Sequence, residues 1–195
     1  MYRRNRWTAM VIGAVAALAL AGNLAVAQTK PFQISGGGVA PDGFPGPGSS
    51  APHWSVGEGS FLGFYEGEGG VYNNSLSGPD EDGDFTGTFC SDGPYVFTGD
   101  DGDKLAVYYG TPDEGTMVTG TYDLVHVSGK VGPGGTYQAF FLAEFVPYDK
   151  GCTGKFKGVT GGWTMYCTTE PFVLGSTDPL GYEWSGRGSL TFAKR

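Results

Sequence analysis

The 195-residue sequence has little charge, few cysteines and no sign of helical periodicity. Charged residues make up only 16% of the chain and aromatic residues 14%, so it has bulky apolar side chains to bury and few charges to keep it unfolded. No segment of ten or more residues after residue 27 shows the 3.6-residue apolar repeat of a helix. The 36 glycines follow no three-residue period, which excludes collagen. We therefore expect a turn-rich, all-β protein.

Long apolar runs are also missing, except for one near the start of the chain. Arg3, Arg4 and Arg6 precede an apolar run over residues 10–21, and Ala25-Val26-Ala27 has the small-x-small pattern of a cleavage site. These are the three parts of a secretory signal peptide. A membrane helix needs roughly 20 apolar residues, and no stretch reaches that length. We expect residues 1–27 to be removed near Ala27, and the mature chain to be soluble and secreted, periplasmic or extracellular.

Basic residues are scarce in the part that remains. Residues 1–27 hold three of the 12 Lys and Arg and none of the 20 Asp and Glu, so the mature chain has nine basic residues and a formal net charge of −11. Nucleic acids and anionic membranes are recognised through clustered Lys and Arg. Neither is an expected partner, and no integral membrane segment is expected. The oligomeric state is not predicted.

Only three cysteines are present, Cys90, Cys152 and Cys167. An oxidising compartment allows one disulfide with one thiol left over. Cys152 and Cys167 lie on either side of a predicted turn at residues 158–162, so we expect these two to pair. No Cys-x-x-Cys or nearby His spacing supports zinc.

Residues 28–53 are rich in Gly and Pro. Gly36-Gly37-Gly38 is followed by Pro41-Asp42-Gly43 and by the run over residues 45–50, a composition that favours neither a helix nor a strand ladder. We interpret this segment as an arm or linker. Phe32 and Ile34 in front of the glycines would make it an ordered strap if they dock on the main body.

From residue 54 onward, apolar residues recur with a period of two. The alternation is clear over residues 61–69, 104–109, 137–146 and 182–192, and Gly, Pro and Asp clusters mark turns between them. Short strands joined as hairpins predict a single antiparallel β-barrel of about eight strands over residues 54–195, with a β-sandwich as the alternative. Glycines inside strands favour the closed barrel. A membrane barrel has the same alternation, but the ending Phe192-Ala193-Lys194-Arg195 argues against it.

Four segments together carry a family resemblance. They are residues 59–69, residues 99–105, residues 152–162 and the Gly-x-Gly-x-Leu-x-Phe run from Gly186. The series resembles secreted bacterial proteins of unknown function thought to share the β-barrel of allene oxide cyclase and the plant dirigent proteins. The resemblance spans residues 54–192 and consists of glycine and turn signals. It therefore implies an architecture, and no catalytic residue can be transferred from it.

The aromatic content suggests a binding site inside such a barrel. Trp and Tyr form cups for ring-containing ligands, although they also simply fill barrel interiors. We expect a small apolar or ring-containing ligand, with the alternative that the same rings are only core. The candidate ligand-binding residues are Tyr65, Tyr109, Phe141, Trp163 and Trp184.

Two acidic runs are candidate cation sites. Asp100, Asp101 and Asp103 surround a glycine, and a second run covers residues 80–84. Closely spaced carboxylates suit calcium, but neither run has the bidentate Glu of an EF-hand loop. Asp and Gly are also preferred turn residues, which is the alternative. No other cofactor is expected.

Catalytic motifs are missing. Glu66 and Glu68 share a strand face and resemble a paired-carboxylate site, but they equally suit a polar outer face. His53 and His126 have no recognisable nucleophile setting. The sequence thus predicts a non-catalytic binding or structural module. The alternative is a cyclase-like enzyme acting on an apolar substrate inside the barrel, which an open pocket holding Glu66 or Glu144 beside aromatic rings would support.

Overall fold

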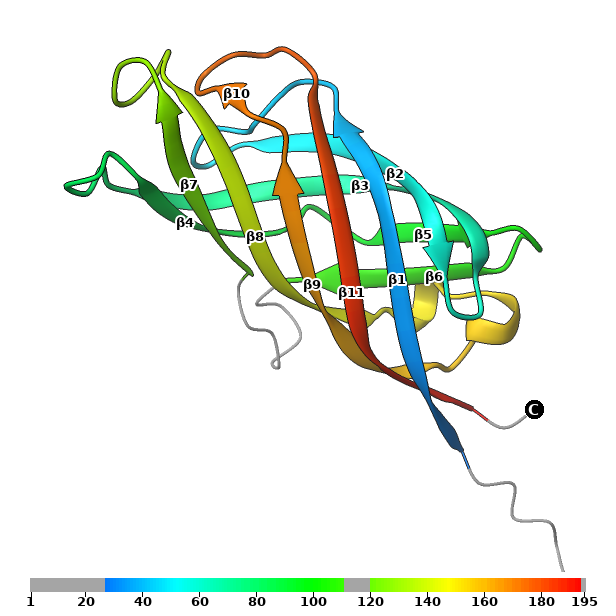
Figure 1. The fold of residues 1–195 in the computed structure, drawn as a ribbon. Coiled ribbons are helices and arrows are strands. Elements are labelled where there is room, and N and C mark those ends of the chain that lie inside the picture. The colour runs from blue at the N-terminus through cyan, green and yellow to red at the C-terminus, as the bar shows by residue number, and fades with distance from the viewer. Residues whose placement is uncertain (1–26, 111–119, 194–195) are drawn as a thin grey trace, which may run out of the picture.

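The computed structural model describes residues 27–110 and 120–193 and is all-β (Figure 1). In these ranges no helix is long and apolar enough to cross a membrane. The predicted signal peptide lies outside the described residues, apart from Ala27. The elements are β1 (Gln28–Ala40), β2 (Ser50–Gly59), β3 (Gly63–Ser77), β4 (Phe85–Ser91), β5 (Tyr95–Gly99), β6 (Lys104–Tyr109), β7 (Gly120–Ser128), β8 (Thr136–Pro147), the 3₁₀ turns η2 (Asp149–Gly151) and η3 (Gly154–Phe156), β9 (Thr160–Thr169), β10 (Phe172–Val173) and β11 (Leu180–Phe192).

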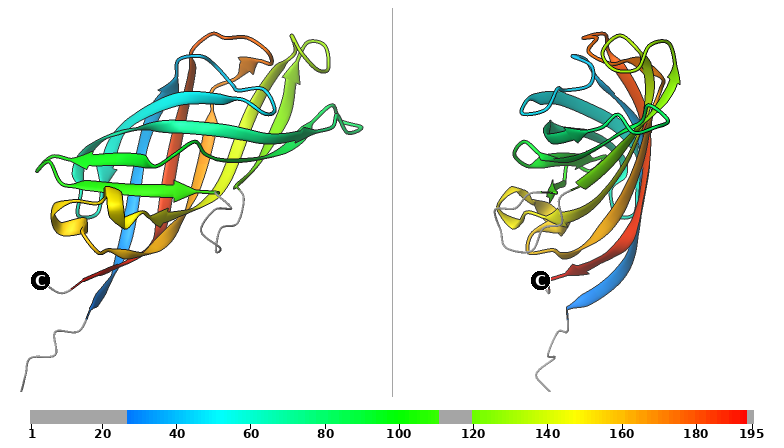
Figure 2. Two further views of the ribbon diagram at one scale, coloured as in Figure 1. Left: turned by 180° about the vertical axis from the view of Figure 1, so that it is seen from behind. Right: turned by 90° about the vertical axis from the view of Figure 1, so that its left-hand side faces the viewer.

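The strands form one antiparallel sheet that closes partly into an uneven, barrel-like ring of eight strands. β4 and β5 run one after the other along β3, and β7 and β6 run along β8, so each pair occupies one strand position of the ring. β1 pairs with β11 and closes it. Figure 2 shows β3, β5 and β6 on the wall opposite β1, β9 and β11, which they cross at a large angle. The predicted barrel of about eight strands is confirmed.

The predicted Gly/Pro-rich arm is wrong for most of its length. Residues 28–40 form β1, which pairs with β11 from Gln28 opposite Phe192 to Ala40 opposite Leu180. Residues 50–53 belong to β2. Phe32 and Ile34 are buried in the core, so their expected docking is confirmed, as part of the barrel wall. Only residues 41–49 form a loop between two strands.

Glycines form a strand here because large rings of neighbouring strands lie across them. A Cβ at Gly36 would lie 2.3 Å from the Tyr65 hydroxyl oxygen, and one at Gly38 would lie 2.4 Å from that of Tyr182. A backbone ladder needs no side chains, so β1 pairs on both edges while its inner face leaves room for the two tyrosines. The glycines that suggested an irregular segment instead leave the space that the interior aromatic side chains require.

The end of the barrel near η3 is filled by an apolar core. Apolar side chains that are completely or almost completely buried meet there from several strands, and burial of each contributes roughly 1.5–3 kcal/mol. The largest are Phe32, Leu62, Phe97, Leu105, Phe156, Trp163 and Leu190. This core leaves free space only farther along the barrel.

The glycine requirement can be tested at two adjacent positions of β1. Gly38→Ala is expected to destabilise the protein by about 1–3 kcal/mol, because its Cβ would lie 2.3 Å from the Trp54 carbonyl oxygen and displace Tyr182. Gly37→Ala is the control, since its Cβ would meet only the Tyr182 carbonyl oxygen, at 3.3 Å. Urea denaturation of both variants measures the difference. Equal free energies of unfolding would show that the close approach is unimportant.

Candidate functional site

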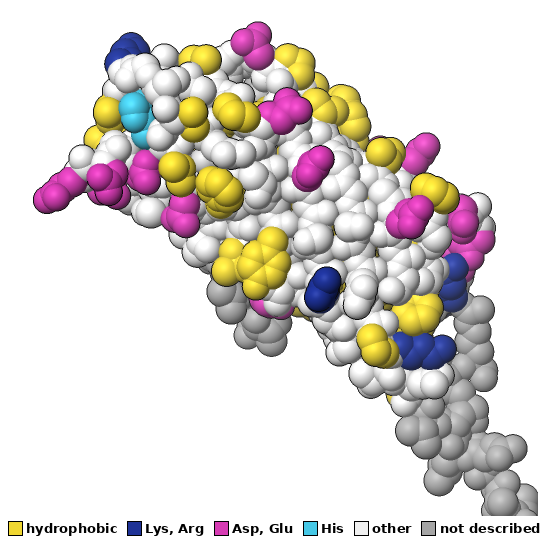
Figure 3. All heavy atoms as spheres, viewed as in Figure 1, with side chains coloured by type: hydrophobic (Ala, Val, Ile, Leu, Met, Phe, Trp, Pro, Cys, Tyr) yellow, Lys and Arg dark blue, Asp and Glu magenta, His cyan; other side chains and the backbone are white. Residues whose placement is uncertain are grey.

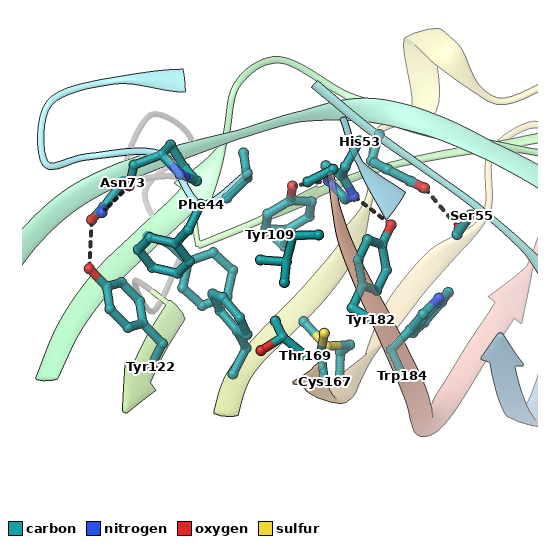
Figure 4. A pocket seen from close by; sticks show the side chains of 18 of the residues that line it. Phe44, His53, Ser55, Asn73, Tyr109, Tyr122, Cys167, Thr169, Tyr182 and Trp184 are labelled. Atoms are coloured by element: carbon teal, nitrogen blue, oxygen red, sulfur yellow. Dashed lines mark hydrogen bonds between the residues drawn. The ribbon is translucent and has the colours of Figure 1, made fainter. Parts of the chain in front are cut away.

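The barrel interior contains a cavity of about 100 Å³ next to the loop between β1 and β2 (Figure 4). Every strand position of the ring contributes to its wall, which is mostly aromatic. Three of the predicted ligand-binding residues, Tyr109, Phe141 and Trp184, line it. Other residues that line the cavity include Phe44, His53, Ser55, Asn73, Tyr95, Tyr122, Cys167, Thr169 and Tyr182.

The other two predicted residues, Tyr65 and Trp163, do not line this cavity. Tyr65 is 3% exposed, donates its hydroxyl to the Ser35 carbonyl at 3.1 Å and packs edge-on against Phe97. Trp163 is 1% exposed and stacks on Phe145 with ring centroids 5.3 Å apart. Both rings therefore belong to the core, which was the alternative interpretation for the aromatic residues.

His53, on β2, is held between two tyrosines in the cavity wall. Its Nδ1 lies 2.8 Å from the Tyr182 hydroxyl on β11, and its Nε2 lies 2.9 Å from the Tyr109 hydroxyl on β6. Its ring also stacks on Tyr95, with centroids 4.7 Å apart. Figure 4 shows the two hydrogen bonds joining strands that are far apart in the sequence.

The surrounding carbonyl groups favour one tautomer of neutral His53. The Tyr182 hydroxyl lies 3.0 Å from the Trp54 carbonyl, and the Tyr109 hydroxyl lies 2.9 Å from the Gly70 carbonyl. The Gly70 carbonyl also accepts the Asp92 N–H at 2.8 Å, so it does not need the Tyr109 proton. Tyr109 can then donate to Nε2, while Nδ1–H donates to Tyr182 and Tyr182 donates to Trp54. A proton on Nδ1 thus satisfies every partner.

Burial keeps this group of side chains neutral. It lowers the pKa of His53 to about 4, because a buried imidazolium loses its hydration. It raises the pKa of Tyr109 and Tyr182 well above the usual value for a phenol, and that of the Cys167 thiol to about 12. At neutral pH these cavity groups therefore carry no charge.

The Ser, Thr and Asn side chains in the wall are also paired. The Ser55 and Tyr95 hydroxyls lie 2.8 Å apart, and Thr169 Oγ1 accepts the Ala139 N–H at 2.9 Å. Asn73, which is 1% exposed, accepts the Tyr122 hydroxyl at 2.9 Å and donates its Nδ2 to the Pro45 carbonyl at 2.7 Å. The wall therefore offers a ligand mainly carbon atoms.

The loop between β1 and β2 covers one side of the cavity with Phe44. The Phe44 ring stacks on Phe172 of β10 and meets Tyr122 edge-on, with centroids 5.3 Å away in each case. The Asn73 bond to the Pro45 carbonyl holds the next residue of the loop in place. Part of the segment that was interpreted as an arm thus supplies part of the cavity wall.

Two of the three predicted calcium residues, Asp101 and Asp103, are used within the described part of the protein, whereas the Asp100 side chain is not. Asp101 forms an ion pair with Lys155, which holds the pKa of that carboxyl below its usual range, and it also accepts the Asp103 N–H. Asp103 accepts the Lys155 N–H at 2.8 Å. In the second acidic run, Asp80 accepts the N–H groups of Asp82 and Asp84. Within residues 27–110 and 120–193, no group of three or more His, Cys, Asp or Glu side chains could hold a metal ion.

The predicted Cys152–Cys167 disulfide is absent, and both of these cysteines are free thiols. Cys152 lies after η2, with its Sγ 3.5 Å from the Ala106 carbonyl, whereas Cys167 faces the cavity. β9 begins at Thr160, and its extended backbone carries Cys167 roughly 23 Å along the barrel from there. A disulfide requires Cα atoms within about 7 Å. The predicted turn therefore does not bring the thiols together.

Carboxylates do not contribute to the described cavity wall. Glu66, Glu68 and Glu144 lie on the outer faces of β3 and β8 and are exposed. Glu144 accepts a hydrogen bond from the Thr164 hydroxyl. The paired glutamates thus form a polar outer face, which was the alternative interpretation. His126 lies on β7 beside Tyr137, away from this cavity.

His53 is not among the predicted site residues, because residues 28–53 are predicted to form an arm or linker. A signal was present in the alternation of Ala51, His53 and Ser55 with Pro52 and Trp54. In β2 the small and polar set faces inward and the apolar set faces outward, with Trp54 49% exposed. A prediction from hydrophobicity alone would have placed Trp54 inside the barrel and His53 outside, which is the reverse of the structure.

Comparisons with known proteins add no further guide to this site, since no family model, curated protein or solved structure matches the chain. The likeness to the allene oxide cyclase and dirigent barrels remains a prediction. The site is therefore interpreted from its geometry alone.

Burial of His53 predicts a specific loss of stability in acid. The histidine pKa is 6.5 unfolded and about 4 folded, so the unfolded chain binds more protons between these values. The stabilisation is complete above pH 6.5 and is lost progressively as the pH falls to about 4, amounting to roughly 3 kcal/mol. His53→Phe leaves both tyrosine hydroxyls a carbonyl acceptor and should remove this component. Urea denaturation at pH 7 and pH 4 measures it, and an equal loss in both proteins would contradict the assignment.

The free thiols predict a simple titration. Without reductant, the denatured protein should react with at least two equivalents of a thiol reagent, because Cys152 and Cys167 are free. The folded protein should react more slowly at Cys167, whose burial raises its pKa to about 12 and suppresses the thiolate. A count of one thiol in the denatured protein would instead indicate a disulfide.

Proposed function

We propose that the barrel holds one small apolar, ring-containing molecule in its interior and acts as a binding module without catalytic machinery. The observation that supports this most directly is the pairing of the polar side chains in the wall, including His53 between Tyr109 and Tyr182. A buried hydroxyl or amide of a ligand would have few partners there, which costs roughly 1–3 kcal/mol. An apolar ligand avoids this cost.

The volume of the cavity limits the size of the ligand. At about 100 Å³ it is smaller than an engineered cavity of about 150 Å³ that stays dry and takes up benzene. It is also smaller than the pockets of drug-sized ligands, roughly 300–1,000 Å³. A single aromatic ring or a short branched alkyl group matches the available space. Aromatic side chains such as Phe141 and Trp184 provide edge and face contacts for such a ring.

The cyclase-like alternative has less support from the cavity. Acid or base catalysis requires a group whose pKa lies near the working pH. His53 has both ring nitrogens engaged and a pKa of about 4, and burial suppresses the Cys167 thiolate. Glu66 and Glu144, which would have favoured catalysis, are on the outside. A role outside the cytoplasm rests on the signal-peptide pattern of residues 1–27.

Small aromatic probes test the proposal. Benzene, toluene and phenol are added separately, and binding is followed by the melting temperature and by two-dimensional NMR of the Trp184 indole N–H. Toluene and benzene should raise the melting temperature and shift the Trp184 signal, because a ligand that binds only the folded state stabilises it. Phenol should bind more weakly than toluene, since its hydroxyl has few partners in the wall.

A pair of variants on β9 provides the control. Cys167→Leu places extra carbon atoms in the cavity and should weaken toluene binding about tenfold or more. Tyr166→Leu changes the adjacent side chain, which points outward and is 62% exposed, and should leave binding unchanged. No response to any probe, or equal binding by both variants, would refute an apolar interior site.

A further inference from the structure

A second concavity, of about 550 Å³, lies on the outside of the barrel. It crosses β3, β2, β1 and β11 near the tight turn between β2 and β3, so it is separate from the interior cavity. The side chains that matter for its chemistry are Gln33, Glu58, Phe64, Asp100, Ser185 and Arg187. We call it the outer groove.

The strand register places these side chains in a row across the wall. Glu58 on β2 lies opposite Phe64 on β3 and opposite Ser35 on β1, and Ser35 lies opposite Ser185 on β11. Neighbouring strands are roughly 4.8 Å apart, so the row extends about 14 Å from β3 to β11. Gln33 and Arg187 form the next outward pair along β1 and β11. On the face shown in Figure 3, charged and apolar side chains occur singly or in small groups, separated by backbone and uncharged polar side chains.

The polar side chains of the outer groove have unused hydrogen-bonding capacity. Within the described ranges, Lys155 and Asp101 form the one ion pair, so Glu58, Asp100 and Arg187 have no such partner there. None of these three side chains, nor that of Gln33, makes a hydrogen bond within the part of the chain that the structure describes. Carboxylates accept, a guanidinium donates and an amide does both.

Phe64 adds an aromatic face at the end of this row. Its ring is 68% exposed, the highest value among the large apolar side chains that the structure describes as exposed. Opposite it across the strand pair is the charged Glu58, so the ring does not continue an apolar patch in that direction. The core of a protein interface is typically depleted of charged residues, which does not describe this groove.

We propose that the outer groove binds a carbohydrate. A sugar ring has an apolar C–H face that would pack on Phe64, and a rim of hydroxyls that each donate and accept hydrogen bonds. Glu58 and Asp100 would accept from these hydroxyls, Arg187 would donate to them, and Gln33 would do both. A volume of about 550 Å³ is in the range of small-molecule sites.

The charge of the outer groove selects among sugars. Two carboxylates, from Glu58 and Asp100, accompany the single guanidinium of Arg187, and the whole chain has a formal net charge of −8. An acidic sugar would be repelled, because its carboxylate adds to an existing negative field. The ligand class is therefore a neutral or amino sugar, and uronic acid and sulfated sugars are disfavoured.

Isothermal titration calorimetry with tetrasaccharides of defined charge tests the inference on the full-length mature protein. The probes are β-1,4-linked tetramers of glucose, N-acetylglucosamine and glucosamine, together with the α-1,4-linked tetramer of galacturonic acid. At least one neutral or amino tetramer should bind, and the galacturonic acid tetramer should not. Failure of all three neutral and amino tetramers to bind would overturn the proposal, as would binding of the acidic tetramer alone.

Two Phe→Ala variants locate the binding. Phe64→Ala should weaken the sugar interaction about tenfold or more, because the stacking face is lost. Phe140→Ala is the matched control, since Phe140 is 41% exposed on the outer face of β8 and does not line the outer groove. Glu58→Gln should weaken binding of the amino tetramer more than that of the neutral ones. Equal affinities of Phe64→Ala and Phe140→Ala would place the sugar elsewhere and refute the inference.

Matching circular dichroism spectra and urea midpoints verify that both variants are folded, and toluene binding reports separately on the interior cavity.

Discussion

The structure depends on large aromatic rings that lie across glycines inside a closed sheet. Tyr65 lies over Gly36, Tyr182 over Gly38 and Tyr122 over Gly87, where a Cβ would meet a tyrosine side-chain atom at 2.2–2.4 Å. An eight-stranded barrel has an interior just wide enough for side chains or one small ligand. With a methyl group or more at these positions the rings would not lie flat against the wall. Glycine at these three strand positions is therefore a packing requirement of the interior.

This packing also explains why polar groups of the wall occur in pairs. A tyrosine that lies flat across one strand directs its hydroxyl toward the backbone of the next, as Tyr182 does toward the Trp54 carbonyl. The same hydroxyl is hydrogen-bonded to His53. The other ring nitrogen of His53 is hydrogen-bonded to Tyr109, so both bonds hold the imidazole in the wall. Buried polar groups must find partners, and here they find one another. The space left in the middle is consequently neutral and apolar, while the charged side chains remain outside the barrel and form the outer groove.

Much of the fold follows from sequence patterns of period two. The alternation over residues 104–109, 137–146 and 182–192 corresponds to β6, β8 and β11, and the glycines within strands correctly favoured closure. The first strand could not be identified in this way. Gly36-Gly37-Gly38 has no side chains to alternate, and its strand conformation is imposed by pairing with β11 and β2. The predicted disulfide failed for a related reason, because sequence separation does not reveal that Cys167 lies far along β9 from the turn that follows Cys152.

The sequence by itself determined an all-β chain, rich in turns and poor in basic residues, with enough aromatic side chains to fill a barrel. These properties depend on composition and on neighbouring residues, which a linear sequence records directly. Only the tertiary structure decided which rings line a cavity and which are core, and it selected Tyr109, Phe141 and Trp184 but excluded Tyr65 and Trp163. It also joined His53 to Tyr182, 129 positions away. Such assignments depend on strand register and barrel closure, which bring together residues that no local pattern connects.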